Sequence, residues 1–208
     1  PLPRVLAGRG TASQAFSSAW AGQWGRLRSA LFGRRADLLA LLAFLDEKWT
    51  VGDLGCGTGQ VAEAPAPFVA RVIAVDESAA MLAAARKRLG RTPSVELRRG
   101  ELEALPLEDG ELDAAIFSLV MHYVGEPDRA LVEARRALRR DGRLVVLDMM
   151  PHDRDEYAHT MGHVWQGFSE ERVTQWAHDA GFGEVRYRPL APDPAAKGPS
   201  LFVASMVN

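Results

Sequence analysis

The segment Thr50–Gln60, T-V-G-D-L-G-C-G-T-G-Q, constrains the fold of this chain more than any other. A short apolar run leads to Asp53, and glycines then occupy three alternate positions, Gly55, Gly57 and Gly59. Because glycine has no Cβ, this spacing lets the backbone turn sharply after a strand and approach a ligand closely. The acidic residue before the turn would repel a pyrophosphate held at a helix N-terminus. We therefore predict a loop that binds a cationic or hydrogen-bond-donating end of its ligand.

A second acidic residue, Asp76, ends the apolar run Val72–Val75. It lies 21 residues after Gly55 (76 − 55 = 21). In nucleoside-binding α/β folds, a carboxylate about 20 residues beyond the glycine turn, at the end of the next strand, bonds the ribose hydroxyls. A nicotinamide dinucleotide fold is the competing interpretation. It requires G-x-G-x-x-G, whereas here the third glycine comes one residue early and an acid precedes the loop.

These two motifs make the chain resemble the class I S-adenosylmethionine-dependent methyltransferases: D-L-G-C-G-T-G resembles the family's first motif and V-I-A-V-D-E-S its second. Similar segments follow at 81–86, 100–107, 112–124 and 138–148, so the resemblance covers roughly residues 35–207. It implies S-adenosylmethionine as cofactor, S-adenosylhomocysteine as product and an α/β fold. That fold is a Rossmann-like, doubly wound, mostly parallel seven-stranded sheet with an antiparallel C-terminal strand and helices on both faces.

The order of strand and helix signals is typical of such a mostly parallel sheet. Strands are expected near residues 49–54, 71–75, 94–98, 112–117, 143–149, 182–189 and 200–207. Helices are expected over 36–45, over 78–89 with Ser78 as N-cap, from Pro127 to Asp141-Gly142, and from Ser169 to Ala180. We expect one methyltransferase domain over residues 1–208, with lid and linker helices in 1–33 and the cofactor-binding core in 34–208.

Composition narrows the class of function. Apolar residues make up 47% of the 208 residues, enough for one sizeable core, and the net charge of −2 gives no electrostatic footprint for nucleic acid. The one cysteine, Cys56, lies in the glycine loop as a small residue rather than a nucleophile; it leaves no internal disulfide, so a cytoplasmic location is expected. No apolar run approaches the ~18 residues of a membrane span. We expect an enzyme that acts on a small molecule, and the oligomeric state is not indicated.

The resemblance also implies which residues contact the cofactor. Asp53 and the backbone of the glycine loop would hold its amino-acid end, and Asp76 would bond the ribose. Met81 either packs on the adenine or faces the core, Glu101 would accept from the exocyclic amine, and Leu102 would offer its backbone N–H to the ring. The complete implied set is Asp53, Gly55, Cys56, Gly57, Gly59, Asp76, Glu77, Met81, Glu101, Leu102, Ser118, Trp20 and Trp24.

The N-terminal residues are the expected lid. Phe16, Trp20, Trp24, Leu27 and Leu31 recur at intervals of three or four residues, as on one face of an amphipathic helix. This face could simply pack on the domain, but in the methyltransferase fold N-terminal helices also lie over the carboxyl ends of the strands. Trp20 and Trp24 would then close the cofactor site and exclude water, which strengthens the electrostatic interactions inside it.

Three of the five histidines lie in residues 150–171, after the fifth expected strand, where an acceptor substrate would bind: His152, His159 and His163. The i, i+4 spacing of the last two suits zinc, but H-E-x-x-H and a third ligand are absent, so no metal is expected. The same segment, and the opening P-L-P-R-V-L-A-G-R-G-T-A-S-Q-A-F, closely resemble methyltransferase domains fused behind winged-helix repressors of the arsenic-repressor type.

Methyl transfer from a sulfonium mainly requires alignment of donor and acceptor, and it requires a base only if the acceptor must lose a proton. His122, just past the fourth strand, is the first candidate base and His152 the second, although either can be structural.

F-S-L-V follows the fourth strand in place of an N-P-P-Y signature, which disfavours nucleic-acid and protein-glutamine acceptors. A small, partly apolar acceptor is indicated by the aromatic set Tyr123, Tyr157, Trp165 and Phe168. A non-catalytic sensor of S-adenosylmethionine or S-adenosylhomocysteine is the alternative function.

Overall fold

The computed structural model describes residues 22–33, 35–90 and 92–208. The chain divides into two compact units, Pro1–Ala43 and Phe44–Asn208. The sequence places the boundary between lid and core after residue 33, and the organisation as one domain stays a prediction. No helix within the described ranges is long and apolar enough to cross a membrane.

Two short helices lie in the N-terminal unit, α2 (Trp24–Phe32) and α3 (Ala36–Leu41), and the 3-10 turn η1 (Leu42–Phe44) follows. An ion pair between Arg28 and Asp37 joins α2 to α3. None of the six residues of α3 is buried. The helix expected over 36–45 is therefore present as α3 and η1, without a buried face of its own.

The predicted apolar stripe falls only partly on described residues. Phe16 and Trp20 lie outside them, and so does the side chain of Trp24, although its backbone begins α2. Leu31, further along the stripe, is 61% exposed. The lid formed by Trp20 and Trp24 stays a prediction.

A seven-stranded sheet forms the centre of the unit Phe44–Asn208, in the order β3-β2-β1-β4-β5-β7-β6. Its strands are β1 (Thr50–Leu54), β2 (Arg71–Asp76), β3 (Val95–Arg99), β4 (Leu112–Ser118), β5 (Leu138–Met149), β6 (Val185–Pro189) and β7 (Leu201–Val207). Neighbours among the first five strands run parallel, whereas β7 is antiparallel to both β5 and β6. This confirms the predicted mostly parallel sheet with one antiparallel C-terminal strand.

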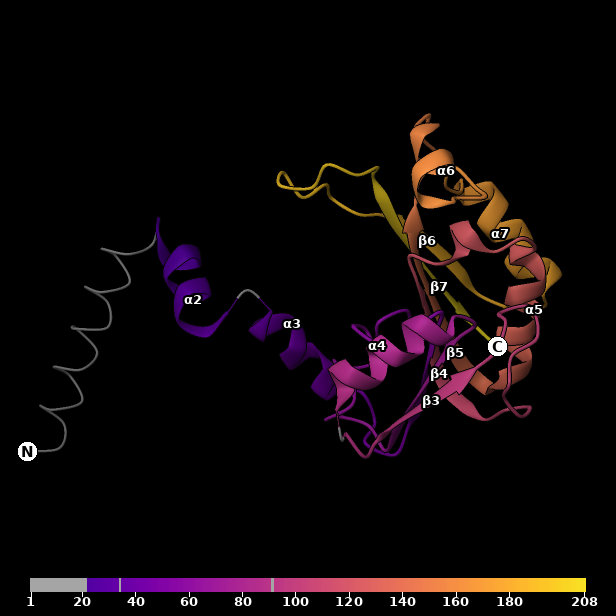
Figure 1. Cartoon of the computed structure of the whole chain (residues 1–208), viewed down its shortest axis with the longest axis horizontal. Helices are drawn as coiled ribbons and strands as arrows, with labels where there is room; N and C mark the ends of the chain where they lie inside the picture. Colours follow the sequence, from indigo (N-terminus) through magenta and orange to yellow (C-terminus); the bar gives the residue numbers. More distant parts are fainter. Residues whose placement is uncertain (1–21, 34, 91) are drawn as a thin grey trace, which may run out of the picture. The chain divides into compact units, whose positions relative to one another are not determined.

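Helices cover both faces of this sheet. Val72 and Ala74 of β2 pack in the cluster that includes α4 (Ala79–Leu89), while Ile73 and Val75 pack in the cluster that includes α5 (Pro127–Ala137) and α7 (Glu170–Asp179). Successive side chains of a strand point to opposite faces, so this division follows from the pleat. Figure 1 shows α5 and α7 side by side. Because both faces are buried, β2 is a continuous apolar run rather than an alternating one.

Two of the helix starts follow the sequence prediction closely. The Oγ of Ser78 accepts from the backbone N–H of Met81 at 3.3 Å and caps α4. The Oγ of Ser169 accepts in the same way from Arg172 at 3.3 Å and caps α7. Each cap satisfies one N–H that the first turn would otherwise leave without a partner. The remaining short elements are η2 (Met121–Tyr123) and α6 (Glu156–Met161).

The predicted end of α5 at Asp141-Gly142 is wrong. The helix ends one residue before Leu138, where β5 begins, because Leu138 is buried and pairs with Leu112 of β4. Asp141 instead bends β5: its φ is +63°, and its N–H donates to the carbonyl of Asn208 at 3.0 Å. The Asp-Gly pair therefore marks a bend within a strand, not the end of a helix.

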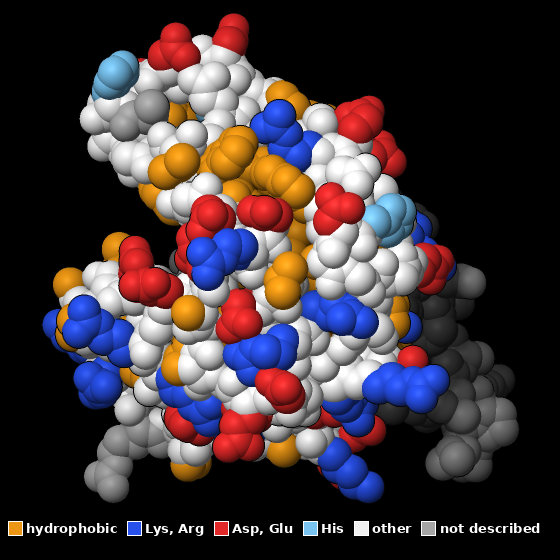
Figure 2. Space-filling model, turned by 90° about the vertical axis from the view of Figure 1, so that its right-hand side faces the viewer, with side chains coloured by type: hydrophobic (Ala, Val, Ile, Leu, Met, Phe, Trp, Pro, Cys, Tyr) orange, Lys and Arg blue, Asp and Glu red, His pale blue; other side chains and the backbone are white. Residues whose placement is uncertain are grey.

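The charged surface carries both signs. On the face in Figure 2, Lys and Arg side chains are interspersed with Asp and Glu, and hydrophobic side chains gather in one patch in the upper half. Arginines of α5 are paired with nearby acids: Arg129 with Glu126 at 2.7 Å and Arg136 with Glu133 at 2.9 Å. The basic residues of this helix are thus largely neutralised by their neighbours.

Candidate functional site

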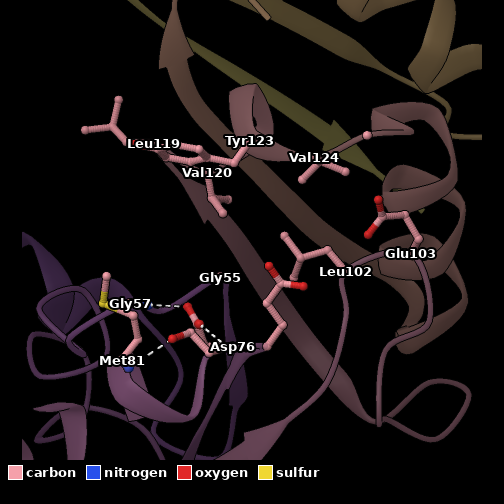
Figure 3. Close-up of a pocket in the computed structure, with 13 residues that line it drawn as sticks. Gly55, Gly57, Asp76, Met81, Leu102, Glu103, Leu119, Val120, Tyr123 and Val124 are labelled. Carbon is pink, nitrogen blue, oxygen red and sulfur yellow. Dashed lines mark hydrogen bonds between the residues drawn. The ribbon is translucent and has the colours of Figure 1, made fainter. Parts of the chain in front are cut away.

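A cavity of about 400 Å³ opens at the carboxyl ends of β1, β2 and β4. Its volume lies in the range typical of small-molecule sites, and its place at the strand ends is where open α/β sheets bind ligands. Figure 3 shows how its lining residues lie. They are Gly55, Gly57, Asp76, Glu77, Ser78, Met81, Leu102, Glu103, Leu119, Val120, Tyr123, Val124 and Gly125.

The glycine loop forms one wall of the cavity. The N–H groups of Gly55 and Cys56 both donate to the carbonyl of Val75, at 2.8 and 2.9 Å, and this holds the loop on the end of β2. Gly55 has φ +77°, and a Cβ there would lie 2.4 Å from Cγ2 of Val120. Gly57 has φ +52° and open space around its Cα. The first glycine therefore serves packing, and the second presents bare backbone to the cavity.

Asp76 lies on the cavity floor, as the sequence predicts. Its Oδ2 accepts from the N–H of Gly57 at 2.8 Å and its Oδ1 from the N–H of Ser78 at 2.9 Å (Figure 3). An ionised carboxylate can accept about four hydrogen bonds, so both oxygens retain capacity for a ligand. The two backbone bonds fix the carboxylate in place and leave it able to bind a diol.

The cavity lining is acidic. Asp76, Glu77 and Glu103 contribute three carboxylates, and none of the lining residues is a lysine or an arginine. Because the partly enclosed space weakens solvent screening, this set favours a cationic ligand group and disfavours a phosphate. The charge distribution therefore argues against a dinucleotide and for a ligand with a positive centre.

Asp53 lies behind the glycine loop and not in the cavity lining. It is 2% exposed; its Oδ2 accepts from the N–H of Ala62 at 2.8 Å, and its Oδ1 has no partner among the described residues. Burial raises the pKa of Asp53 to about 7, the Ala62 N–H opposes that rise, and the charge of Asp76 adds to it. Burial and the charges of Asp53 and Asp76 likewise raise the pKa of the Cys56 thiol to about 12. The thiol is therefore protonated at neutral pH and is no nucleophile.

At the end of the cavity where the adenine is expected, the glutamate that lines it is Glu103 and not the predicted Glu101. Met81 is 45% exposed and lines the cavity, so it does not face the core, and Leu102 lines the cavity as expected. Glu101 forms a bridge with Ala104 and lines a neighbouring hollow, whereas Glu103 lines the main cavity. The sequence did not single out Glu103. Its only signal is a second glutamate two residues after Glu101, in the turn that follows β3.

The second wall of the cavity, which adjoins Gly55 of the glycine loop, begins after β4. Phe117 is fully buried in the core, and Ser118 does not line the cavity. Leu119, the next residue, has φ +54°, a left-handed conformation that is rare for a bulky side chain and is often found at functional sites. It directs the chain into the wall formed by Val120 and Tyr123 (Figure 3).

His122 is buried and paired with a carboxylate. Its Nδ1 lies 2.8 Å from Oδ1 of Asp148, near the end of β5, and the two residues are 3% and 0% exposed. The same oxygen accepts from the N–H of Met149 at 2.7 Å, while Oδ2 of Asp148 has no partner among the described residues. The sequence did not single out Asp148 as a functional residue. An acid at the carboxyl end of a central parallel strand was the available signal.

Residues 150–168 fold back over this pair. The N–H of Phe168 donates to the carbonyl of Met149 at 2.9 Å, and the N–H of Val164 donates to the carbonyl of His122 at 2.9 Å. Gly167 permits this close return, because a Cβ there would lie 2.2 Å from the carbonyl oxygen of Met150. As a result, the ring of His163 lies 4.2 Å from the ring of His122.

The i, i+4 spacing of His159 and His163 in the sequence does not place them on one helix. α6 ends at Met161, with Gly162 in a left-handed C-cap, so His163 lies beyond the helix, and His159 is exposed. Burial lowers the pKa of His163, with a smaller contribution from His122; burial and then the charge of Arg154 lower that of His152. No group of three or more potential metal ligands is found among the described residues.

Residues 52–146 match a family model described as a methyltransferase domain. The chain is 46% identical over 98 residues to an uncharacterized 37.1 kDa protein in transposon TN4556 of Streptomyces fradiae. This match covers 45% of this chain and 28% of that protein. It is 27% identical over 164 residues to the demethylmenaquinone methyltransferase of Clavibacter sepedonicus, covering 66% of this chain and 67% of that one. The chain thus spans less than a third of the first relative and about two thirds of the second.

A solved structure supports the fold. The S-adenosylmethionine-dependent methyltransferase from Aquifex aeolicus superposes with a TM-score of 0.66 at 24% identity, covering 86% of this chain and 92% of that one. At this identity the likeness shows a shared fold. The sheet order and the helices on both faces are therefore those of a known architecture.

Proposed function

We propose that this chain is a member of the class I S-adenosylmethionine-dependent methyltransferase family and that it transfers the methyl group of S-adenosylmethionine to a small-molecule acceptor by in-line displacement, as the matches to a methyltransferase domain and to methyltransferases support. The acidic cavity at the strand ends carries the proposal. Its carboxylates suit a ligand with a sulfonium and an ammonium, and its lining holds no basic residue for a phosphate. The cofactor, when bound, supplies an already activated methyl group, so the protein contributes mainly alignment.

We assign the cofactor contacts from the cavity lining and from the sequence motifs. Gly55 and Gly57 line the cavity, whereas Cys56 and Gly59 do not, and Gly59 packs against α4. The backbone of this loop would receive the amino-acid end, with Asp53 behind it as the buried negative charge. Asp76 would accept from the ribose hydroxyls with its remaining lone pairs, which is supported by its fixed orientation between two backbone N–H groups. Ser118 lies one residue before the wall of the cavity, where it would adjoin the methionine chain.

At the adenine end, Met81 and Leu102 supply apolar contact, and both line the cavity. Glu101 and Glu103 are the candidate acceptors for the exocyclic amine, and the position of Glu103 in the lining favours it. Glu77 lines both the main cavity, with Glu103, and the neighbouring hollow, with Glu101. It therefore borders both candidate acceptors.

The acceptor would enter against the wall that follows β4. Leu119 and Tyr123 line the cavity there and are 43% and 46% exposed, so an apolar ring could cover them. The printed names of several relatives, demethylmenaquinone methyltransferases, support an apolar ring acceptor. Covering these side chains would also exclude water from the transferring methyl. Proton acceptance would fall first to His122 and second to His152.

Two further expectations stay proposals. Trp20 and Trp24 would close the site as a lid. The likeness of residues 1–16 and 150–171 to methyltransferase domains fused behind arsenic-repressor-type regulators is supported by those segments of sequence alone.

Calorimetric titration tests the proposed cofactor. S-adenosylmethionine and S-adenosylhomocysteine should bind near micromolar, about −8 kcal/mol, and NAD should not bind. Formation of S-adenosylhomocysteine with a naphthohydroquinone as acceptor then tests the transfer. Binding of NAD alone would refute the cofactor assignment. Tight binding without turnover across an acceptor panel would instead support the sensor.

A further inference from the structure

We propose that Asp148 positions His122 as the proton acceptor of the transfer, so that the site suits acceptors whose reacting atom carries a removable proton, such as phenols. This inference rests on the proposed methyl transfer. It deepens that function by naming a chemical class of acceptor and a positioning residue that the sequence did not reveal.

The pairing fixes which nitrogen of His122 carries a proton. An ionised carboxylate only accepts hydrogen bonds, so the nitrogen that faces Asp148 at 2.8 Å, Nδ1, must be the donor. In the neutral ring this leaves the lone pair on Nε2. Within the described part of the chain, Nε2 makes no hydrogen bond of its own. The imidazole is therefore held in the tautomer that can accept a proton from outside the pair.

The ring is also held in place beside the cavity. The carbonyl of His122 accepts from the N–H groups of Val164 and Trp165, at 2.9 and 3.1 Å. The ring contacts those of Tyr123, at 4.3 Å, and His163, at 4.2 Å, and these two rings also lie 5.0 Å from each other. Tyr123 itself lines the cavity (Figure 3). His122 itself is not among the lining residues; its ring contacts that of Tyr123, which lines the wall against which the acceptor would rest.

A purely structural role explains this arrangement poorly. Burying a carboxylate and an imidazole costs free energy, and a packed apolar pair of similar volume is often as stable or more so. Oδ2 of Asp148, Nδ1 of His163 and Nε2 of His152 are all buried without a partner among the described residues. Buried polar atoms normally find partners, and exceptions gathered around one histidine next to a cavity are typical of a functional site.

The neighbouring histidines help His122 to take up charge. Burial lowers the pKa of both His163 and His152, which disfavours positive charge on these rings and so weakens their repulsion of an imidazolium at His122. Asp148 supplies the only carboxylate bonded to the His122 ring in the described structure, and it balances the charge that the ring gains. Tyr123 and Tyr157 contact the cluster, and Arg154, Asp153 and Glu156 are the charged groups near His152.

The proposed step is balanced. The acceptor gives its proton to Nε2 of His122 as its oxygen or carbon forms a bond to the methyl carbon. The electron pair of the broken S–CH₃ bond stays on sulfur, which becomes a neutral thioether. The imidazolium, paired with Asp148, then releases the proton to solvent. One methyl group and one proton are exchanged, and no oxidant or metal is required.

The variants Asp148→Asn and His122→Gln test the assignment, with the exposed Asp128→Asn and His178→Gln as matched controls. Turnover is measured with S-adenosylmethionine and a series of naphthols and phenols of decreasing acceptor pKa. Both variants should lose about tenfold or more in kcat with the least acidic acceptor, and much less with one already ionised at the assay pH. The Kd of S-adenosylmethionine should stay within about twofold of the wild type. A loss that is equal across the series would mean a structural role and would overturn the proposal.

A second measurement does not depend on turnover. Nitrogen NMR of the full chain should place the proton of neutral His122 on Nδ1, and Asp148→Asn should shift or remove that preference. A proton on Nε2 in the wild type overturns the inference. Absence of turnover by the wild type with every acceptor refutes the methyl transfer itself, whereas undiminished turnover of the least acidic acceptor in both variants refutes only the base.

Discussion

The backbone N–H of Gly57 donates to Oδ2 of Asp76 at 2.8 Å, and this bond joins the two motifs that the sequence offered separately. The glycine loop follows β1, and the carboxylate ends the neighbouring strand β2. Because Ser78 donates to the other oxygen, the carboxylate is oriented by the protein before a ligand contributes anything. Orientation in advance removes an ordering cost from binding.

Asp76→Asn should weaken the binding of S-adenosylmethionine by about 10- to 100-fold, since a hydrogen bond to a charged group contributes roughly 1.5–3 kcal/mol. Asp76→Ala should weaken it further, because it also leaves two N–H groups without their acceptor. Calorimetric titration measures both, with the exposed Glu108→Gln as control. Near-wild-type affinity in both Asp76 variants would contradict the ribose assignment.

Gly55 and Gly57 offer a matched pair of substitutions. Both have positive φ, but a Cβ at Gly55 meets Val120 at 2.4 Å, while at Gly57 it meets nothing within 4 Å. Gly55→Ala should therefore lower the free energy of unfolding by about 3 kcal/mol, and Gly57→Ala by only about 1 kcal/mol. Gly57→Ala should instead reduce cofactor affinity about tenfold, because its Cβ enters the cavity. Urea unfolding and calorimetry separate the two effects, and equal losses of stability would contradict this division of roles.

More of the fold than of the site could be predicted from the sequence. Short apolar runs predict most of the strands, and two serine caps predict two helix starts, to within a few residues, because these signals are local. The end of α5 was missed because the burial of Leu138 against β4 outweighs the local Asp-Gly signal. Asp148 lies close to His122 because β5 pairs with β4, whereas His163 reaches it only because residues 150–168 fold back on β5, a return that no local pattern encodes.

Gly167 is the residue on which this return depends. A Cβ at Gly167 would clash with the carbonyl of Met150 at 2.2 Å, whereas Gly162, also at positive φ, has open space. Gly167→Ala should lower the free energy of unfolding by about 3 kcal/mol and Gly162→Ala by about 1 kcal/mol, as urea denaturation would measure. In the folded fraction, Gly167→Ala should also reduce kcat while cofactor affinity persists, since only the histidine cluster moves. Equal effects from the two alanines would show that the segment does not rely on this contact.

Asp53 should make the stability of the chain fall as pH rises. Its pKa is about 7 in the folded chain against an ordinary value of 3.8, because burial disfavours the carboxylate. Between these values the folded state holds a proton that the unfolded state has lost. This group's contribution is therefore fully present below about pH 4 and decreases up to about pH 7. Over roughly 3 pH units the decrease amounts to at most about 4 kcal/mol.

Asp53→Asn removes this titration, so the variant should gain stability relative to the wild type as pH rises from about 4.5 to about 7.5. Urea unfolding at both pH values measures the difference. Binding should respond in the opposite sense: a cationic ligand favours the carboxylate, so wild-type affinity for S-adenosylmethionine should increase over the same range. In Asp53→Asn that increase should be absent, while the exposed Glu108→Gln should retain it. A variant whose affinity still rises with pH as in the wild type would show that Asp53 does not sense the ligand's charge.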